Sequence, residues 1–277
     1  MYESVNTGTR SVVEPCSPSM VRRIAAMLDL EVPTLEDGDV LPRGWHFFLL
    51  AGETRKSALR PDGFPGLGVP VPELGLPRLL LGGRNVVYHG DITIGSQVER
   101  TSFVRNIVEK NTASGRIAIV TIQHALRPVT EPHPVITENQ TYILMGEKRT
   151  GQATPEIAVP AFVEGIYQKQ LIPDETHLFQ YSALGFNSHK IHLDVNYTRE
   201  IEGLPDLVVN GGLATLFMTE FLRLDLGLEP KEITVKHLAP LYCQRPMTLS
   251  ANRNESDWQL VVYDEKFQKA IEAIVKI

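Results

Sequence analysis

The residues best suited to chemistry in this chain lie close together between Tyr181 and Asp194. Within this stretch, Asn187 contributes a carboxamide, and His189 and His192 contribute two imidazoles. Histidine suits proton transfer because its unperturbed pKa of about 6.5 lies near neutral pH. The oxygen of a carboxamide can accept a hydrogen bond from water and hold that water in place. The cluster therefore indicates general acid and base chemistry.

A helix-like run begins soon after this cluster, at Asn210, Gly211 and Gly212. Backbone N–H groups at a helix start can stabilise a developing oxyanion. Glycines let a ligand approach that backbone closely because they have no Cβ. Hydrating an enoyl thioester needs a base for the water, an acid for the α-carbon and a stabiliser for the enolate oxygen. The cluster and the helix start together are typical of such a site.

Each of these residues also has a structural interpretation. An isolated histidine is more often a core residue than a catalyst, His189 could merely stabilise its loop, an asparagine can cap a turn, and paired glycines can serve helix packing. His189, His192 and Asp194 are also of types that bind metals. No third histidine lies nearby and the sequence has no HExxH motif, so we expect no metal site.

The composition excludes several classes of protein. With 43% hydrophobic and 22% charged residues among 277, the chain is globular. The net charge of −6 argues against a nucleic-acid partner. We expect neither a signal peptide nor a membrane span. Cys16 and Cys243 form no CxxC pair and no disulfide framework, which favours a reducing, cytoplasmic location. Neither cysteine lies in a recognisable catalytic setting. Walker A, GxGxxG and GxSxG motifs are absent.

The first half of the chain predicts one helix, a long irregular segment and several strands. Ser17 can cap the helix, and Pro18 suits its first turn. Residues 30–77 are rich in Pro and Gly, which is typical of binding loops or lids, with a short element at 45–50. The β-branched runs predict strands at 85–88, 92–94, 99–109, 116–124 and 141–145.

The second half predicts a similar set of elements after a linker at 150–161. A polar loop holds the chemical cluster, followed by a short helix over 196–201 and a longer one over about 211–224, whose apolar stripe we expect in the core. Strands follow at 232–237, 246–251, 258–263 and 270–277, although the isoleucine spacing in the last segment also fits a helix. A long helix wrapped by antiparallel strands is the hotdog architecture, and two such halves form a double hotdog.

The chemical cluster resembles a known family. Its pattern N-x-H-x-I-H-x-D runs from Asn187 to Asp194, and G-x-P-x-L-V-V-x-G follows from Gly203 to Gly211. Both resemble the R-specific enoyl-CoA hydratases, which are MaoC-like hotdog proteins. The similarity is greatest to the double-hotdog branch, which includes mesaconyl-C4-CoA hydratase, itaconyl-CoA hydratases and type 2 hydroxyacyl-thioester dehydratases.

The first half of the chain is similar to the same branch through three weaker motifs, which are L-P-R ending at Arg78, G-G-R ending at Arg84 and Y-H-G-D ending at Asp91. The resemblance therefore covers most of the chain and implies an α+β double hotdog with two antiparallel sheets, each wrapped around a central helix. Residues 1–150 would form the first hotdog, which accommodates substrate. Residues 160–277 would form the catalytic, MaoC-like hotdog.

The resemblance also implies individual roles. His192 falls on the family's catalytic histidine. Asn187 falls where most R-specific hydratases carry a catalytic aspartate, so we expect His192 to be the only base and Asn187 to orient the water. The N–H of Gly211 is implied to bind the thioester oxygen, and Asp194 to fix the loop. Gly212 departs from the residues common at its position, which affects the shape of the pocket.

The implied substrate is a CoA thioester, so coenzyme A arrives with the substrate and no separate cofactor is expected. Basic residues are expected to bind its phosphates, and Arg84 is the first candidate to face a free carboxylate of the acyl group. The substrate-binding candidates are His189, Gly212, Arg84 and Lys190, with Arg78 and Arg199 as further phosphate-binding candidates.

The implied reaction is reversible hydration of a short branched C5 dicarboxylic enoyl-CoA, from itaconyl-CoA or mesaconyl-C4-CoA to citramalyl-CoA. Three alternatives remain open: dehydration of 3-hydroxyacyl thioesters in fatty-acid synthesis, hydrolysis by a hotdog thioesterase, and acyl-CoA binding without catalysis. An acyl-CoA is the expected partner, without nucleic acid or membrane. A homodimer is compatible with the resemblance, because the exposed faces of double hotdogs often pair.

Overall fold

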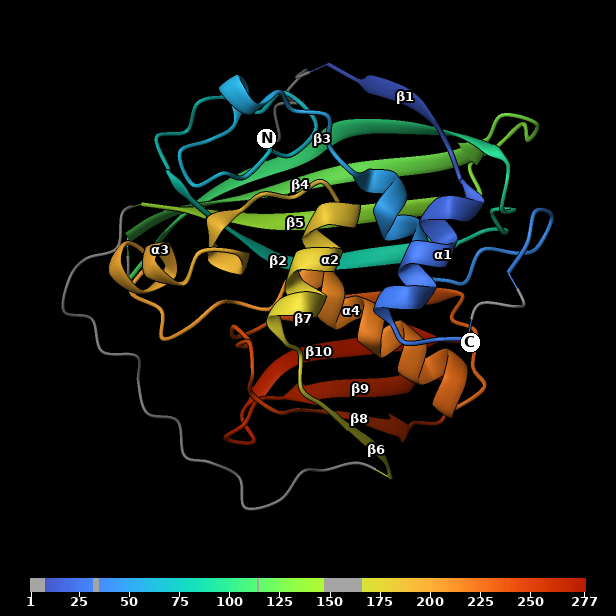
Figure 1. The fold of residues 1–277 in the computed structure, drawn as a ribbon. Coiled ribbons are helices and arrows are strands. Elements are labelled where there is room, and N and C mark those ends of the chain that lie inside the picture. The colour runs from blue at the N-terminus through green and yellow to red at the C-terminus, as the bar shows by residue number, and fades with distance from the viewer. Residues whose placement is uncertain (1–7, 32–34, 114, 147–165) are drawn as a thin grey trace.

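The computed structural model describes residues 8–31, 35–113, 115–146 and 166–277. Within these residues, one antiparallel sheet of ten strands has the order β1-β3-β4-β5-β2-β7-β10-β9-β8-β6 (Figure 1). The first half of the chain contributes β1 (Arg10–Pro15), β2 (Arg78–Tyr88), β3 (Gln97–Thr112), β4 (Gly115–Pro128) and β5 (Ile136–Met145). The second half contributes β6 (Tyr167–Leu171), β7 (Glu232–His237), β8 (Met247–Arg253), β9 (Trp258–Tyr263) and β10 (Lys269–Lys276).

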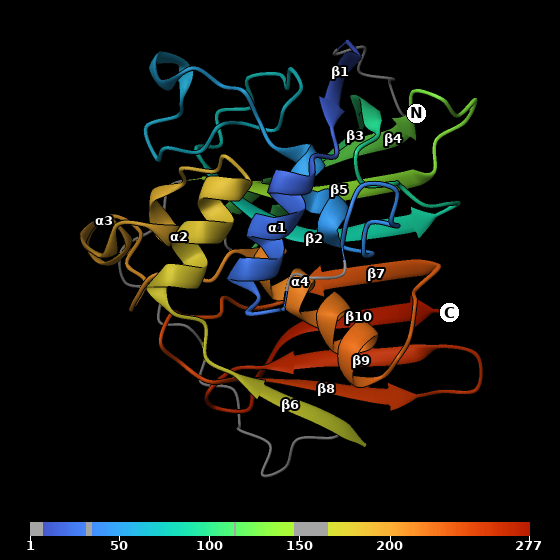
Figure 2. The same cartoon turned by 45° about the vertical axis from the view of Figure 1, so that its right-hand side comes forward.

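Helices cover one face of this sheet. They are α1 (Pro18–Met27), α2 (Glu175–Leu184), α3 (Val195–Glu200) and α4 (Gly211–Glu220). Both views show α1, α2 and α4 on the same side of the strands (Figures 1 and 2). The α+β double hotdog predicted from the sequence is thus confirmed, with α1 and α4 as the helices of its two halves. None of the described helices has the length and apolar character needed to span a membrane.

The two expected sheets are joined edge to edge, because β2 of the first half pairs with β7 of the second. Gly83 lies at this junction, where the register of β2 against β5 also shifts. A Cβ on Gly83 would collide with the carbonyl oxygen of Val235 in β7. The absence of a side chain at Gly83 therefore lets β7 approach β2 closely at this point of the junction.

The helix starts follow simple capping rules. The Ser17 hydroxyl accepts the Met20 N–H at 3.2 Å, and Pro18 opens α1, as expected. The predicted α4 stripe is buried up to Phe221. Leu224 is 48% exposed, contrary to the expected core position. The helix changes to a π-helical turn over Phe221–Asp225, which holds more residues per turn and rotates Leu224 out of the apolar face.

Three elements were missed by the sequence reasoning. The strands β1 and β6 lie at the two edges of the sheet, are short, and bury little. The segment expected to be a polar loop begins instead with α2, which carries Tyr181. Its cap is a reciprocal pair of Asp174 and His177 rather than the Glu or Gln that usually marks such a box.

Other predictions have mixed outcomes. Residues 92–94 form no strand, although the isolated bridge between Val40 and Thr93 lies there. The described part of the segment 30–77 is irregular apart from two 3₁₀ helices, at Trp45–Leu50 and Lys56–Ala58, as expected. The linker predicted at 150–161 lies outside the described residues.

Candidate active site

One cavity of about 430 Å³ brings most of the predicted site residues together. Its lining comes from both halves of the chain: the irregular segment before β2, β2 itself, the loop after α2, and the start of α4. The predicted residues that line it are Arg84, Asn187, His189, His192, Gly211 and Gly212. The size suits a small acyl group with part of its carrier.

His192 is held in one tautomer by the backbone. It ends a 3₁₀ turn over Lys190–His192, and its Nδ1 lies 2.7 Å from the carbonyl oxygen of Val208. A carbonyl oxygen only accepts hydrogen bonds, so Nδ1 carries the hydrogen and donates it. In the neutral ring, Nε2 is then left with a free lone pair. That lone pair is the acceptor that a general base needs.

The surroundings keep His192 uncharged at neutral pH. Burial and, to a lesser extent, the neighbouring His189 lower its pKa to about 3, against the opposing effect of the hydrogen bond to Val208. The side chain is only 8% exposed. A buried, neutral imidazole with a fixed tautomer can accept a proton without first losing one.

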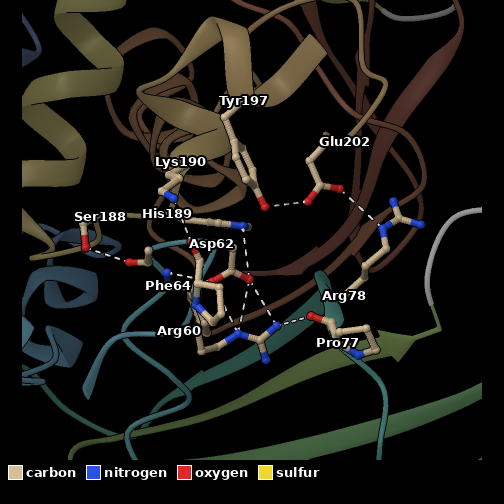
Figure 3. A network of polar contacts seen from close by, with 12 residues as sticks. Arg60, Asp62, Phe64, Pro77, Arg78, Ser188, His189, Lys190, Tyr197 and Glu202 are labelled. Atoms are coloured by element: carbon tan, nitrogen blue, oxygen red, sulfur yellow. Dashed lines mark hydrogen bonds and ion pairs between the residues drawn. The ribbon is translucent and has the colours of Figure 1, made fainter. Parts of the chain in front are cut away.

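His189 lies beside His192, with 5.6 Å between the ring centroids and the ring planes nearly perpendicular. Its Nε2 is 3.8 Å from Oδ2 of Asp62, which comes from the irregular segment of the first half (Figure 3). The Phe64 ring packs edge-on against the His189 ring, with 5.6 Å between the ring centroids. Burial lowers the pKa of His189, and the Asp62 carboxylate opposes that shift.

Asn187 lines the cavity and also holds the backbone of its own loop. Its Oδ1 accepts the backbone N–H of His189 at 3.1 Å, which fixes the turn between them. An amide oxygen has two lone pairs, so this oxygen can still accept from a water. Asp194 lies outside the cavity lining and caps α3, accepting the Tyr197 N–H at 3.0 Å. It fixes the loop, as expected.

Lys190 is not part of the cavity lining, although it was a substrate-binding candidate. Its Nζ donates to the carbonyl oxygen of Pro61 at 2.8 Å and lies 5.1 Å from the centre of the Tyr197 ring. The side chain ties two loops together, which occupies the ammonium group (Figure 3).

The two further phosphate-binding candidates differ. Arg78 lines the cavity and pairs with Glu202 at 3.4 Å. Arg199 lies outside the lining, donates to the carbonyl oxygen of Pro205 at 3.0 Å and pairs with Asp206 at 3.3 Å. The structure thus brings Arg78, but not Arg199, to the site.

The start of α4 offers backbone donors to the cavity. The first N–H groups of a helix have no acceptor within it, and Asn210 does not cap α4 with its side chain. The glycines also serve close packing: a Cβ on Gly212 would collide with the Tyr181 hydroxyl, and one on Gly211 would lie 3.2 Å from Cε1 of His237. The two glycines therefore allow close packing of neighbouring side chains, and the backbone N–H groups at the start of α4 are still available to the cavity.

Arg84 belongs to a buried network that sequence reasoning missed. Its Nη1 lies 3.2 Å from Oε1 of Glu138, and its guanidinium stacks 4.0 Å above the centre of the Phe47 ring. Glu138 also contacts Nε2 of His46 at 3.0 Å and accepts from Gln140 at 2.8 Å. Burial raises the pKa of Glu138, but Arg84 and His46 outweigh it and hold that pKa at about 2.

Some donors of this network have no partner among the described residues. Arg84 is 6% exposed, yet its Nε makes no hydrogen bond, and its Nη1 has only the ion pair with Glu138. The buried Nε2 of His237, on the same cavity, also lacks a partner. Burial, together with Arg84, lowers the pKa of His237 to about 3. A buried guanidinium with free N–H groups is suited to bind an oxygen anion.

The missed residues had weak sequence signals. Glu138 and Gln140 alternate along β5 with less buried residues and share the inward face with Ile136. Period-2 alternation predicts a strand but not which face is buried, so polar residues there suggest solvent. Asp62 lies in a Pro-Asp-Gly turn, which indicates only a turn. Among the described residues, no group of three His, Cys, Asp or Glu side chains is arranged to hold a metal ion.

Because several histidines are buried in their neutral form, we expect the free energy of unfolding to decrease in acid. Burial lowers the pKa of His124 to about 4, whereas an unfolded histidine titrates near 6.5. Between these values the unfolded state binds more protons, so the free energy of unfolding falls as pH decreases. Replacing His124 by Gln is expected to reduce this pH slope by about 1 kcal/mol per pH unit. Urea unfolding between pH 4.5 and 6.5 measures it. The exposed His133→Gln is the control, and an unchanged slope in His124→Gln would contradict the assignment.

Comparison with known proteins agrees with this geometry. The family model for hydroxyacyl-thioester dehydratase type 2 matches residues 44–243. The chain is 29% identical over 260 residues to mesaconyl-C4-CoA hydratase of Chloroflexus aurantiacus, covering 93% of this chain and 92% of that one. It is 23% identical over 243 residues to the mitochondrial type 2 hydroxyacyl-thioester dehydratase of Schizosaccharomyces pombe, covering 79% and 80%.

A solved structure supports the fold. A Mycobacterium tuberculosis protein described as having a double hotdog fold superposes with a TM-score of 0.63, at 11% identity, over 97% of this chain and 94% of that one. The family match spans most of the chain and includes the histidine cluster, the start of α4 and Arg84. The chain therefore belongs to the type 2 hydroxyacyl-thioester dehydratase family of MaoC-like hotdog proteins and is a hydro-lyase of the enoyl-CoA hydratase and dehydratase kind.

Proposed function

We propose that this protein reversibly hydrates a short branched C5 dicarboxylic enoyl-CoA, converting itaconyl-CoA or mesaconyl-C4-CoA to citramalyl-CoA. The observation that carries the proposal is the buried guanidinium of Arg84, whose Nε–H has no partner among the described residues, on the same cavity as His192. A thioester at His192 would place the far end of a short acyl group near this donor site. A free carboxylate there would supply the missing acceptors.

The histidine cluster would perform the addition of water. Nε2 of His192 takes a proton from a water molecule whose other contact is the Asn187 carboxamide oxygen. In mesaconyl-C4-CoA, whose C=C is conjugated with the thioester, the oxygen of that water bonds to the β-carbon and the π electrons move onto the thioester oxygen. The Gly211 N–H, at the positive end of α4, stabilises the resulting enolate. The His192 imidazolium can then return a proton to the α-carbon, which completes the addition. In itaconyl-CoA the C=C lies one bond further away, so a proton must first move from the α-carbon to the terminal CH2 to give the conjugated form.

The polar end of the cavity favours a dicarboxylic substrate over a linear one. A methyl-terminated chain would bury methylene groups against Arg84 and His237 and leave the Nε–H of Arg84 and the Nε2 of His237 unpaired, which costs roughly 1–3 kcal/mol for each buried group. The relative from Chloroflexus aurantiacus, whose name specifies a mesaconyl thioester, points to the same substrate class. The relative from Schizosaccharomyces pombe, named a hydroxyacyl-thioester dehydratase, supports dehydration of 3-hydroxyacyl thioesters as the second candidate.

Purified protein mixed with itaconyl-CoA, mesaconyl-C4-CoA or crotonyl-CoA provides the test. We expect the enoyl-thioester absorbance to fall faster with mesaconyl-C4-CoA than with crotonyl-CoA, without release of free thiol. Itaconyl-CoA, whose C=C is not conjugated with the thioester, is followed by chromatography of the citramalyl-CoA formed. Thiol release would identify a thioesterase instead. Preference for crotonyl-CoA would favour the linear dehydratase, and binding without any turnover would indicate a non-catalytic acyl-CoA protein.

A further inference from the structure

We propose that Asp62, a carboxylate from the first half of the chain, is a positioning residue that makes His189 the second proton-transfer group of this site. The inference rests on the proposed hydration and goes beyond it. In that reaction, His192 alone would take the proton from water and return it to a different atom. A second imidazole, supported by a carboxylate, would divide these two steps between two groups.

The segment that carries Asp62 is fixed against the histidine loop by several contacts (Figure 3). The backbone N–H of Lys190 donates to the Asp62 carbonyl oxygen at 2.8 Å, and the Ser188 hydroxyl donates to the Gly63 carbonyl oxygen at 2.7 Å. Gly63 has a φ of +78°, and a Cβ there would collide with the Ser188 carbonyl oxygen. The contact between Asp62 and His189 thus belongs to a built interface between the two halves.

The Asp62 carboxylate has one oxygen committed to its own loop and one facing the imidazole. Oδ1 accepts the Phe64 N–H at 2.9 Å, which holds the side chain in its turn. Oδ2 lies 3.8 Å from Nε2 of His189 and 3.1 Å from the Arg60 guanidinium. Asp62, His189 and His192 all line the cavity. A small movement on substrate binding would bring Oδ2 and Nε2 into hydrogen-bond distance.

The other charges around His189 are already engaged with one another. The Tyr197 hydroxyl donates to Glu202 at 3.0 Å, and Arg78 pairs with the same carboxylate at 3.4 Å. Asp62 and Glu202 favour the charged form of His189, whereas burial and Arg60 oppose it. The ionisable groups that face His189 from the elements around it are Arg60, Asp62, His192, Tyr197 and Glu202.

The proposed proton transfers balance as follows. Nε2 of His192 removes a proton from water as the oxygen bonds to the β-carbon, and the enolate forms. The His189 imidazolium, paired with Asp62, delivers its proton to the α-carbon and becomes neutral. The proton on His192 then returns to His189, directly or through water, and both rings regain their starting state. Activity therefore requires a neutral His192 and a protonated His189.

The need for a protonated His189 determines how activity changes with pH. Activity falls as pH rises through the pKa of His189, and Asp62 raises that pKa. Replacing Asp62 by Asn keeps the Oδ1 acceptor for the Phe64 N–H but removes the charge. We expect the alkaline limb of kcat/KM to move to lower pH, with a loss on the order of tenfold at pH 8 and little loss at low pH.

The control is Ser188→Ala, which removes another contact of the same interface without changing a charge near His189. We expect its alkaline limb to stay at the position of the unmodified protein. A loss in Asp62→Asn that is equal at every pH, or an equal shift of the limb in Ser188→Ala, would overturn the proposal. Either result would leave Asp62 with a purely structural role.

A second measurement separates this inference from the proposed substrate. Titration of the unliganded protein, followed by NMR of its labelled histidine rings, reports His189 directly and needs no turnover. We expect Asp62→Asn to lower the pKa of His189 and to leave that of His192 unchanged. An unmoved His189 titration would refute the role of Asp62 even if the thioester is hydrated. A lowered pKa without hydration of any C5 thioester would instead refute the proposed function.

Discussion

Replacing His192 by alanine is expected to reduce turnover of the preferred enoyl-CoA by a factor on the order of 10² or more. The expectation follows from the hydrogen bond of Nδ1 to the Val208 carbonyl, which leaves Nε2 as the free base. Because burial keeps the ring neutral, the loss should appear in kcat at any pH from about 5 to 8. Steady-state rates measured by the decrease in enoyl-thioester absorbance provide the test.

His192→Asn is the matched variant, since the Asn amide can still donate to Val208 but has no basic nitrogen. We expect it to keep the thermal stability of the unmodified protein and to be as inactive as His192→Ala. If His192→Asn retained near-normal activity, the hydrogen bond to Val208 would be the function of this residue, and the base would have to lie elsewhere.

The sequence predicted this part of the site because its members are neighbours in the chain. The motif from Asn187 to His192 folds into one turn, and the glycines at the start of α4 lie on the same cavity. Local spacing also predicted the α1 cap at Ser17 and most of the strands. Such features depend on contacts over a few residues, which a pattern can express.

The rest of the site depends on contacts between distant segments. Asp62 reaches His189 because hydrogen bonds join two loops that are far apart in the sequence, and Glu138 is buried because its strand turns that face inward. Alternating polar residues in a strand are equally compatible with a solvent face. The sequence made Arg84 a candidate to face a substrate carboxylate. It did not indicate the partner of Arg84 in the protein, since no short-range pattern links Arg84 to Glu138. Pairings of this kind are decided by tertiary packing.

Arg84 provides the second large expected effect, on the choice of substrate. Removing Arg84 alone would leave the buried carboxylate of Glu138 without its main counter-charge, which typically costs about 3–5 kcal/mol and could unfold the protein. The informative variant is therefore Arg84→Gln combined with Glu138→Gln, which removes both charges together. Glu138→Gln alone is the matched control, because it keeps the guanidinium in the cavity. It also leaves a buried charge without its partner, so its thermal unfolding is measured first to establish that it is folded.

For the double variant, we expect kcat/KM with itaconyl-CoA or mesaconyl-C4-CoA to fall roughly 10- to 100-fold, as for the loss of a charge-assisted hydrogen bond. Crotonyl-CoA has no free carboxylate, so its kcat/KM should change much less. Glu138→Gln should keep the preference for the dicarboxylic substrate. Equal losses with all three thioesters in the double variant would show that Arg84 supports the fold of the cavity and does not recognise a carboxylate. In that case the selectivity would have to come from cavity shape, since the donors of Arg84 would no longer distinguish a dicarboxylic acyl group from a linear one.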